Sequence, residues 1–280
     1  MTTPTIDSPT IVSATIDSAT LAREARPKLG GVVSDALTMT WRNLLRLTRN
    51  PELMVFSTVQ PIIFVLMFRY VFGGAIHIPG VPYVDFLMAG VWVQSVTFGA
   101  LNTGVGLAED LQAGLIERFR SLPMARSAVL VGRTTADLVR NVFVVSVMTA
   151  MGFLVGFHYH AGALGLIGAL GIVLFFSYAL SWLSALLGLI APNAETAQAA
   201  FFPIVAVLVF ASAAFVPVHT MPGWLQAFAN HQPVTAVIDA VRALTLGGPT
   251  GGKVVSALLW IAGIVAVFAP LSIYRYRKVA

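Results

Sequence analysis

Residues 163–190 read ALGLIGALGIVLFFSYALSWLSALLGLI, a run in which no side chain carries a charge. A transmembrane helix needs about 20 mostly apolar residues to cross the roughly 30 Å of hydrocarbon in a bilayer. The run is long enough, so it predicts a membrane-spanning helix. Comparable apolar runs recur at approximately 53–75, 84–107, 134–157, 198–216 and 254–274. The chain is therefore predicted to be an all-α membrane protein with six transmembrane helices.

The overall composition agrees with this fold class. Apolar residues make up 57% of the 280 residues, and charged residues only 10%. Soluble domains carry about 25% charged residues, so lipid is expected to cover the surface here. No gap between the apolar runs is long enough for a soluble domain, which indicates one membrane domain over residues 30–280. The sequence has no cysteine, which excludes disulfides, thiolate metal sites and cysteine nucleophiles.

The first 29 residues differ from the rest of the chain. The tetrapeptide TIDS at 5–8 recurs at 15–18, in a Ser/Thr-rich stretch without helical periodicity. The stretch lacks the basic start and the apolar core of a secretory signal. Residues 1–29 are therefore predicted to be a disordered cytoplasmic tail.

The distribution of Lys and Arg predicts the orientation, because cytoplasmic loops carry an excess of positive charge. With the N-terminus inside, the outer segments hold only Arg242 and Lys253. The inner segments then hold Arg23, Arg26, Lys28, Arg42, Arg46, Arg49, Arg118, Arg120, Arg126, Arg133, Arg275, Arg277 and Lys278. Six spans return the C-terminus to the cytoplasm. The net charge of +5 is explained by this bias, so nucleic-acid binding is not required.

A helix is predicted before the first span. Ser34-Asp35 can cap it, Leu37, Trp41 and Leu45 fall at near-helical spacing, and Pro51 ends it. An apolar face with basic residues on its flank is typical of a helix that lies in the membrane interface.

The charged stretch 109–124 is the most informative soluble segment. Leu111, Leu115 and Phe119 follow one another at four-residue spacing, which predicts a short amphipathic helix broken at Pro123. The residues by themselves fit equally well an ordinary loop between spans and a docking helix that passes force from a cytoplasmic partner.

Residues 217–252 are too polar and too interrupted to span the bilayer. Trp224 and Phe228 nevertheless contribute to apolar faces that suit the outer interface. Such a segment could help a lipid-like substrate to leave, and plain loop packing explains the pattern equally well.

Few polar residues lie within the spans. Gln60, Gln94 and Asn102 are candidates for a substrate pathway, although polar side chains also form hydrogen bonds between transmembrane helices. Asp137 and Arg140 stand at i, i+3 and can pair. The spans show no lone carboxylate at mid-depth of the kind that a proton-driven carrier uses, and no set of groups typical of an intramembrane enzyme.

Residues 247–253, GGPTGGK, nearly match a phosphate-binding loop. The next residue is Val254, which lacks the hydroxyl that binds Mg²⁺, and the predicted location is extracytoplasmic. We therefore expect neither nucleotide binding nor catalysis by this chain. The five histidines all fall on the predicted outer side, and His158 and His160 alone are a weak metal motif, so no metal site is expected.

The stretch 114–126, GLIERFRSLPMAR, followed by Gly132-Arg133, resembles the signature of type-2 ABC exporter permeases. The similarity is greatest to the daunorubicin-resistance-like branch of actinobacteria and covers roughly residues 30–278. Further blocks agree with it: FRYVFGGA at 68–75, FVP at 215–217, MPGWLQ at 221–226, NHQPV at 230–234 and DAVRAL at 239–244.

The resemblance implies a permease subunit of an ATP-driven exporter in the bacterial plasma membrane, moving an amphipathic drug, lipid or glycolipid. It implies that two permease chains, identical or different, pair with two ATPase subunits that bind the ATP and Mg²⁺. The alternative is an ion-driven secondary carrier. The resemblance makes the stretch 109–124 a coupling helix, represented by Glu109, Gly114, Glu117, Arg118, Arg120, Leu122 and Pro123. It makes residues 218–246 short re-entrant or interfacial helices on the outer side, represented by Trp224, Phe228, Asp239 and Arg242.

Overall fold

The computed structural model describes residues 35, 37–45, 51–74, 76, 78–114 and 126–279, and the predicted tail at 1–29 lies outside these ranges. The regular secondary structure of the described residues is entirely helical. After a helical stretch at 37–45, the elements are α3 (Pro51–Met67), the π-helix η1 (Phe68–Phe72), α4 (Tyr83–Gly99), α5 (Leu101–Gln112), α7 (Arg126–Leu154), α8 (Gly162–Ile190), α9 (Ala194–Phe210), the 3₁₀-helix η2 (Val218–Thr220), α10 (Gly223–Asn230), α11 (Pro233–Leu246) and α12 (Gly251–Val279).

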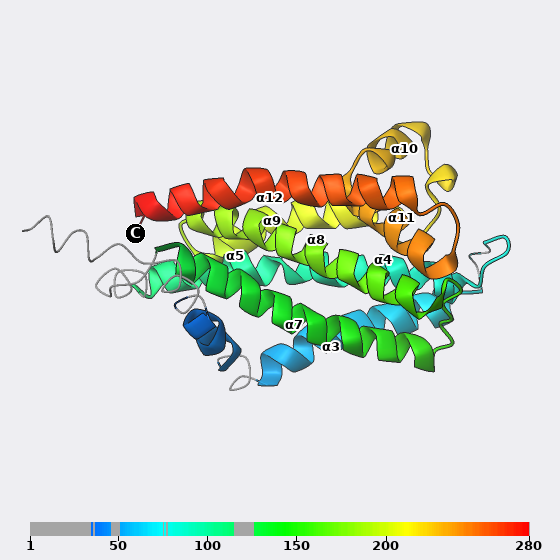
Figure 1. Ribbon diagram of the computed structural model, residues 1–280, viewed down its shortest axis with the longest axis horizontal. Helices are drawn as coiled ribbons and strands as arrows, with labels where there is room; N and C mark the ends of the chain where they lie inside the picture. The colour runs from blue at the N-terminus through cyan, green and yellow to red at the C-terminus, as the bar shows by residue number, and fades with distance from the viewer. Residues whose placement is uncertain are drawn as a thin grey trace, which may run out of the picture.

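Most of these helices run along the long axis of one bundle (Figure 1). Four helical stretches in the described residues are long and apolar enough to cross a membrane: Tyr83–Gln112, Val129–Leu154, Gly162–Ile190 and Gly251–Lys278. The other two predicted spans coincide with shorter apolar helices, Thr58–Val71 and Ala194–Phe210. The structure therefore confirms an all-helical, multi-span architecture, and four of the six spans meet the length that a crossing needs.

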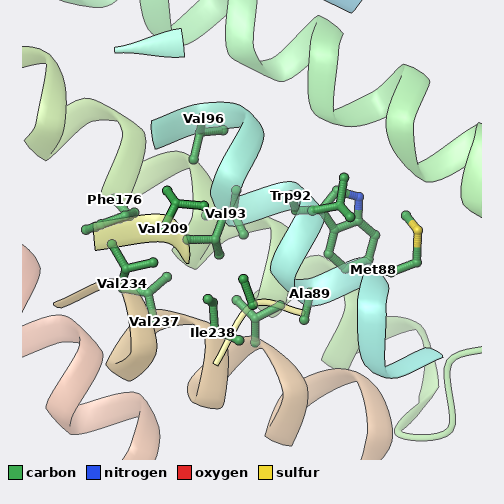
Figure 2. Close-up of a cluster of buried hydrophobic side chains, with 14 of the residues drawn as sticks. Met88, Ala89, Trp92, Val93, Val96, Phe176, Val209, Val234, Val237 and Ile238 are labelled. Atoms are coloured by element: carbon green, nitrogen blue, oxygen red, sulfur yellow. The ribbon is translucent and has the colours of Figure 1, made fainter. Parts of the chain in front are cut away.

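The buried core centres on α4. Met88, Ala89, Trp92, Val93 and Val96 of α4 contact side chains of α8, α9 and α11 (Figure 2). In an apolar 18-residue segment of Tyr83–Gln112, 78% of the residues are buried, whereas in the corresponding segment of Gly251–Lys278 only 11% are, although that stretch has the highest hydropathy of the four. A peripheral helix that is more apolar than the central one is expected when lipid, rather than water, surrounds the protein.

Backbone-to-backbone contact joins α5 to α8. A Cβ atom built on Gly188 would lie 2.2 Å from the carbonyl oxygen of Gly104, and one built on Gly104 would lie 2.5 Å from that of Ser184. Small residues are common at membrane helix interfaces because they let two backbones approach closely. The contact fixes the position of α5 against the centre of the bundle.

The segment 37–45 is helical, as predicted. Leu37 and Trp41 are more than 60% exposed, while Thr40 is buried and its Oγ1 donates to the carbonyl oxygen of Gly132 on α7 at 3.2 Å. The apolar side chains therefore point away from the protein, as an interfacial helix requires. Its place at the membrane surface stays a prediction.

The two outer helices differ from each other. α10 lies outside the bundle, at the end opposite the C-terminus (Figure 1), and its Trp224 is 75% exposed. In contrast, α11 packs against α4, α8 and α12, and its Arg242 is buried. An interfacial position fits α10 only, because the polar groups of α11 are used inside the protein.

Candidate functional site

The three polar residues that the sequence proposes for a pathway come together in one cavity. Its volume is about 260 Å³, and α3, the α4–α5 pair and α9 form its walls. The lining residues are Gln60, Pro61, Phe64, Gln94, Ser95, Phe98, Gly99, Leu101, Asn102, Val105, Gln198 and Phe202. The wall thus combines four carboxamides with three phenylalanine rings.

The carboxamides differ in exposure. Gln60, Asn102 and Gln198 are exposed, whereas Gln94 is 3% exposed and its Oε1 has no hydrogen-bond partner. Gln198 was missed by the sequence analysis because it stands at the very start of the apolar run 198–216. Its helix begins at Asn193, whose Oδ1 accepts from the amide of Thr196 at 2.7 Å, so Gln198 lies in the first turns of α9. The sequence signal that could have identified Gln198 is a polar side chain about one turn after a helix N-cap.

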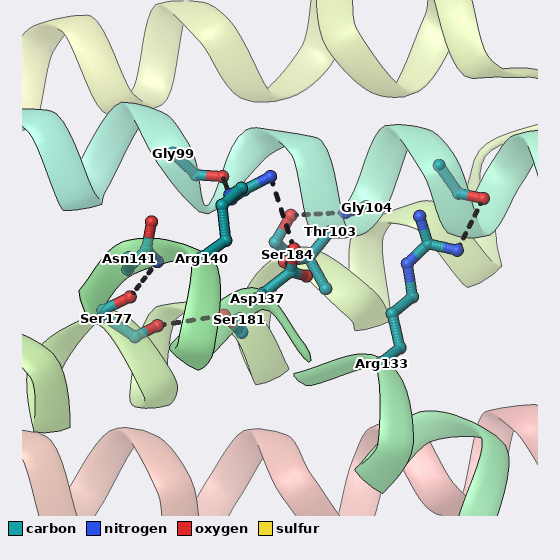
Figure 3. A network of polar contacts seen from close by, with 11 residues as sticks. Gly99, Thr103, Gly104, Arg133, Asp137, Arg140, Asn141, Ser177, Ser181 and Ser184 are labelled. Carbon is teal, nitrogen blue, oxygen red and sulfur yellow. Dashed lines mark hydrogen bonds and ion pairs between the residues drawn. The ribbon is translucent and has the colours of Figure 1, made fainter. Parts of the chain in front are cut away.

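A break between α4 and α5 forms part of the cavity wall. An unbroken α-helix would pair the amide of Thr103 with the carbonyl of Gly99, but this amide donates to Ala100 at 3.1 Å. Gly99 O instead accepts from Nη2 of Arg140 on α7 at 2.9 Å (Figure 3). Side chains from neighbouring helices therefore satisfy the backbone at the break.

Asp137 completes this contact. Its carboxylate lies 3.4 Å from the Arg140 guanidinium, as the i, i+3 spacing predicts, and also accepts from the Thr103 hydroxyl. On the opposite side, Oγ of Ser184 on α8 accepts from the amide of Gly104 at 2.9 Å. Polar groups of α7 and α8 thus hold the first turn of α5 in place.

A second ion pair lies nearer the end of α5. Arg133 of α7 pairs with Asp110 and donates to the carbonyl oxygen of Gly106 at 2.9 Å. The sequence analysis assigned neither residue a partner, because they are 23 positions apart and belong to different helices. The pair attaches the second half of α5 to α7.

The predicted coupling stretch begins where α5 ends. Glu109 is exposed in the last turn of α5, and Gly114 follows it with a φ of +65°, a conformation that favours glycine. Glu117, Arg118, Arg120, Leu122 and Pro123 lie outside the described residues, so their role stays a prediction. Within the described part, α5 links the cavity wall directly to the start of this stretch.

Arg242 organises a buried, non-helical segment after α9. Its guanidinium donates to the carbonyl oxygens of Phe86 and Ala214, both at 3.1 Å, and lies 3.4 Å from the centroid of the Phe86 ring. Gln232 donates to Ala211 O at 2.7 Å. Buried irregular backbone requires such partners, because its polar groups have no neighbouring backbone in a regular ladder to pair with.

The charge of Arg242 survives this burial. Burial lowers its pKa to about 9, and interactions with Asp239 and Tyr83 oppose the shift, so the guanidinium stays protonated at neutral pH. Burial also raises the pKa of Asp239, against the charges of Arg242 and Lys253. Of the predicted outer residues, Arg242 is buried and Asp239 is half-buried, while Trp224 and Phe228 remain at the surface. The described ranges contain no cluster of three or more His, Asp or Glu side chains that could hold a metal.

Comparison with known proteins gives a consistent result. Residues 35–246 match the family model described as "ABC-2 type transporter". The chain is 36% identical to the daunorubicin resistance ABC transporter permease protein DrrB1 of Streptomyces coeruleorubidus, over 92% of this chain and 91% of that protein. It is 29% identical to the probable doxorubicin resistance ABC transporter permease protein DrrC of Mycobacterium tuberculosis, over 88% and 89%. It is 24% identical to the putative transport permease ycf38 of Pyropia yezoensis, over 76% and 74%.

Proposed function

This chain belongs to the ABC-2 type transporter family, and on that premise we propose that it is the membrane-spanning permease subunit of an ATP-driven exporter. Its cargo is an amphipathic or hydrophobic molecule that leaves the cytoplasm or the inner leaflet. Two ATPase subunits hydrolyse the ATP, and a second permease chain, identical or different, completes the complex. The observation that carries the proposal is the cavity. Four carboxamides line it, and part of its wall is α5, the helix that leads to the predicted coupling stretch.

Exposed carboxamides at membrane depth support a pathway. Gln60, Asn102 and Gln198 would each lose hydrogen bonds if hydrocarbon covered them. They gather on one wall instead of pointing separately into lipid. A polar cargo or the second permease would satisfy them, so the cavity lies on the route of the cargo.

The proposed topology has six spans with both termini in the cytoplasm. Besides the four long helices, α3 continues without interruption into η1, which extends this helix to Phe72. The non-helical segment after α9 continues that element toward Pro217, and Gln232 and Arg242 satisfy backbone carbonyls within it. Both extensions support crossings longer than the regular α-helices alone.

The coupling role is assigned to the stretch 109–124. Force from the ATPase would enter at this stretch and reach the cavity through α5, which contacts α7 in its first turn through Thr103 and Asp137 and in its second half through Gly106 and Arg133. Because Gly99 both lines the cavity and binds Arg140, a movement of α5 would change the cavity wall.

The alternative is an ion-driven carrier, which needs a carboxylate that can exchange protons. The carboxylates buried along α5 and α7, Asp110 and Asp137, are each paired with an arginine. Each of these two carboxylates is thus already engaged in an ion pair within the bundle. This pairing supports the ATP-driven exporter over the carrier.

Purification of the tagged full-length chain from its native membranes tests the proposal. We expect an ATPase subunit to co-purify at a one-to-one ratio, with ATP hydrolysis that orthovanadate inhibits. Inside-out vesicles should accumulate cargo with ATP and keep doing so when a protonophore collapses the proton gradient. Transport by the chain without any ATPase, driven by the proton gradient, would overturn the proposal in favour of the carrier.

A further inference from the structure

The wall of the cavity contains no ionisable side chain among its lining residues in the described part of the chain. Its polar groups are the carboxamides of Gln60, Gln94, Asn102 and Gln198 and the hydroxyl of Ser95. Carboxamides donate and accept hydrogen bonds without carrying a charge. The wall can therefore bind hydroxyl, carbonyl and amide groups of a ligand, and it offers no counter-charge.

Gln94 is the buried carboxamide of this wall. It is 3% exposed, it lines the cavity, and its Oε1 accepts no hydrogen bond in the structure. A buried acceptor without a donor is costly. Among the described residues, Oε1 of Gln94 is one of six such buried polar atoms, and of these six it alone belongs to a lining residue of the cavity. The last torsion of a glutamine side chain is soft, and a small rotation presents the amide to a ligand in the cavity.

The nearest charged pair on this wall is already in use. Arg140 contacts Gly99, a lining residue, but its guanidinium is bound by the Gly99 carbonyl and by Asp137. Asp137 in turn also accepts from Thr103. Neither charge is available to a ligand, so a charged group in the cavity would lose its hydration without gaining an ion pair.

The apolar part of the wall suits a flat ring system. Phe64, Phe98 and Phe202 come from three different helices, and the rings of Phe98 and Phe202 lie 5.9 Å apart in a tilted arrangement. The volume of about 260 Å³ is slightly below the roughly 300–1,000 Å³ of drug-sized sites. The cavity therefore holds one part of an amphipathic molecule and not the whole.

We propose that this cavity binds the uncharged, hydrogen-bonding part of an aromatic amphipathic molecule through Gln94 and its neighbouring carboxamides, and discriminates against the same molecule when it carries a net charge. The inference rests on the proposed function, since it describes the cargo that the permease accepts. A positive charge could instead be attracted by the phenylalanine rings. Tighter binding of the positively charged molecule is therefore the result that would contradict the proposal.

A matched pair of probes tests the proposal. Daunorubicin carries a protonated amine, and its N-acetyl derivative keeps the fluorescent ring system but is uncharged. Binding of each is measured by fluorescence to the full-length chain in phosphatidylcholine nanodiscs, with empty nanodiscs as the baseline. We expect saturable binding, with the uncharged probe bound about tenfold more tightly.

Variants of the wall should abolish this preference. Gln94→Glu places a counter-charge at the buried position and should favour the cationic probe by about tenfold over wild type. Because a buried carboxylate can impair folding, Asn102→Asp provides the same change at an exposed wall position. Asn193→Asp is the control: Asp caps α9 as well as Asn does, and it adds an equal charge outside the cavity.

The proposal is overturned if neither probe shows saturable binding, if wild type binds the cation equally well or better, or if the control shifts the ratio as much as the wall variants do. Binding in nanodiscs requires no ATPase. If the expected binding preference is found but ATP-driven transport fails, the proposed function alone is contradicted. If ATP-driven transport is found but the binding preference is not, this inference alone is contradicted.

Discussion

The guanidinium of Arg140 on α7 donates to the carbonyl oxygen of Gly99, the last residue of α4, at 2.9 Å. This contact takes the place of the backbone hydrogen bond that a continuous helix would form, so the helical hydrogen-bonding pattern is interrupted at a joint between α4 and α5. The joint borders the cavity, and α5 leads from it to the predicted coupling stretch. It is therefore the place where a movement of α5 would alter the cavity.

Arg140→Gln should weaken both stability and coupling. The change leaves Asp137 buried without its cation, which typically costs about 3–5 kcal/mol. In the intact complex we expect a lower melting temperature and a lower ratio of cargo transported to ATP hydrolysed. The double variant with Asp137→Asn should regain stability because neither charge is then unpaired. Equal losses in the double and single variants would show that the two residues do not act as a pair.

Gly188→Ala should disrupt the contact between α8 and α5. The added methyl would lie 2.2 Å from the Gly104 carbonyl oxygen, so the two backbones must separate. Overpacking of this kind costs about 1–3 kcal/mol. Gly171→Ala on the same helix is the matched control, since nothing lies within 4 Å of its Cβ position and alanine favours helix. Thermal unfolding in detergent compares the two, and equal melting temperatures would argue against the tight contact.

Arg242→Leu should release the buried segment after α9. Without the guanidinium, the Ala214 carbonyl loses its partner. The chain contains no cysteine, so Ala214→Cys is a unique reporter, and Ala214 is 0% exposed. We expect a membrane-impermeant maleimide to label this cysteine at least about tenfold faster in the Arg242→Leu background. As a control, Thr250→Cys should label equally fast with Arg242 and with Arg242→Leu. A slow reaction of the cysteine at position 214 in both backgrounds would rule out that Arg242 holds this segment.

Charge reversal at Glu117 or Arg118 should abolish transport and leave the protein in the membrane. On the proposed coupling role the change alters the surface that meets the ATPase, so expression and melting temperature should remain close to wild type. Transport in inside-out vesicles and ATPase activity of the complex are the measurements. Normal transport by such a variant would remove the coupling assignment from this stretch.

The orientation is tested with single cysteines in intact cells. A cysteine at Thr250 should react with an impermeant maleimide, whereas one at Thr2 or Lys278 should react only after the cells are permeabilised. Labelling of either terminal cysteine in intact cells would contradict the positive-inside assignment.

The sequence alone was sufficient for the all-helical fold class, for the four long helices and for several of their polar residues. Apolar runs predicted the positions of the long helices. A backbone in lipid must satisfy its own hydrogen bonds and therefore forms a helix, and a helix that crosses the bilayer needs about 20 apolar residues. The i, i+3 spacing predicted the pair of Asp137 and Arg140, which one helix brings together without any help from the fold. Gln60, Gln94 and Asn102 were recognised because polar side chains are rare in such runs.

Only the tertiary structure decided how these elements are used. No local pattern in the sequence around Ala100 predicts the break between α4 and α5. The backbone groups beside it are bonded by Arg140 and Ser184, which belong to other helices. The burial of α11 and the convergence of the carboxamides likewise depend on several helices at once. The physical reason is that lipid tails and protein side chains are almost equally apolar, so hydropathy indicates that a helix avoids water but not which helix it contacts. That choice is made by close backbone contacts, such as Gly104 with Gly188, and by buried hydrogen bonds between helices.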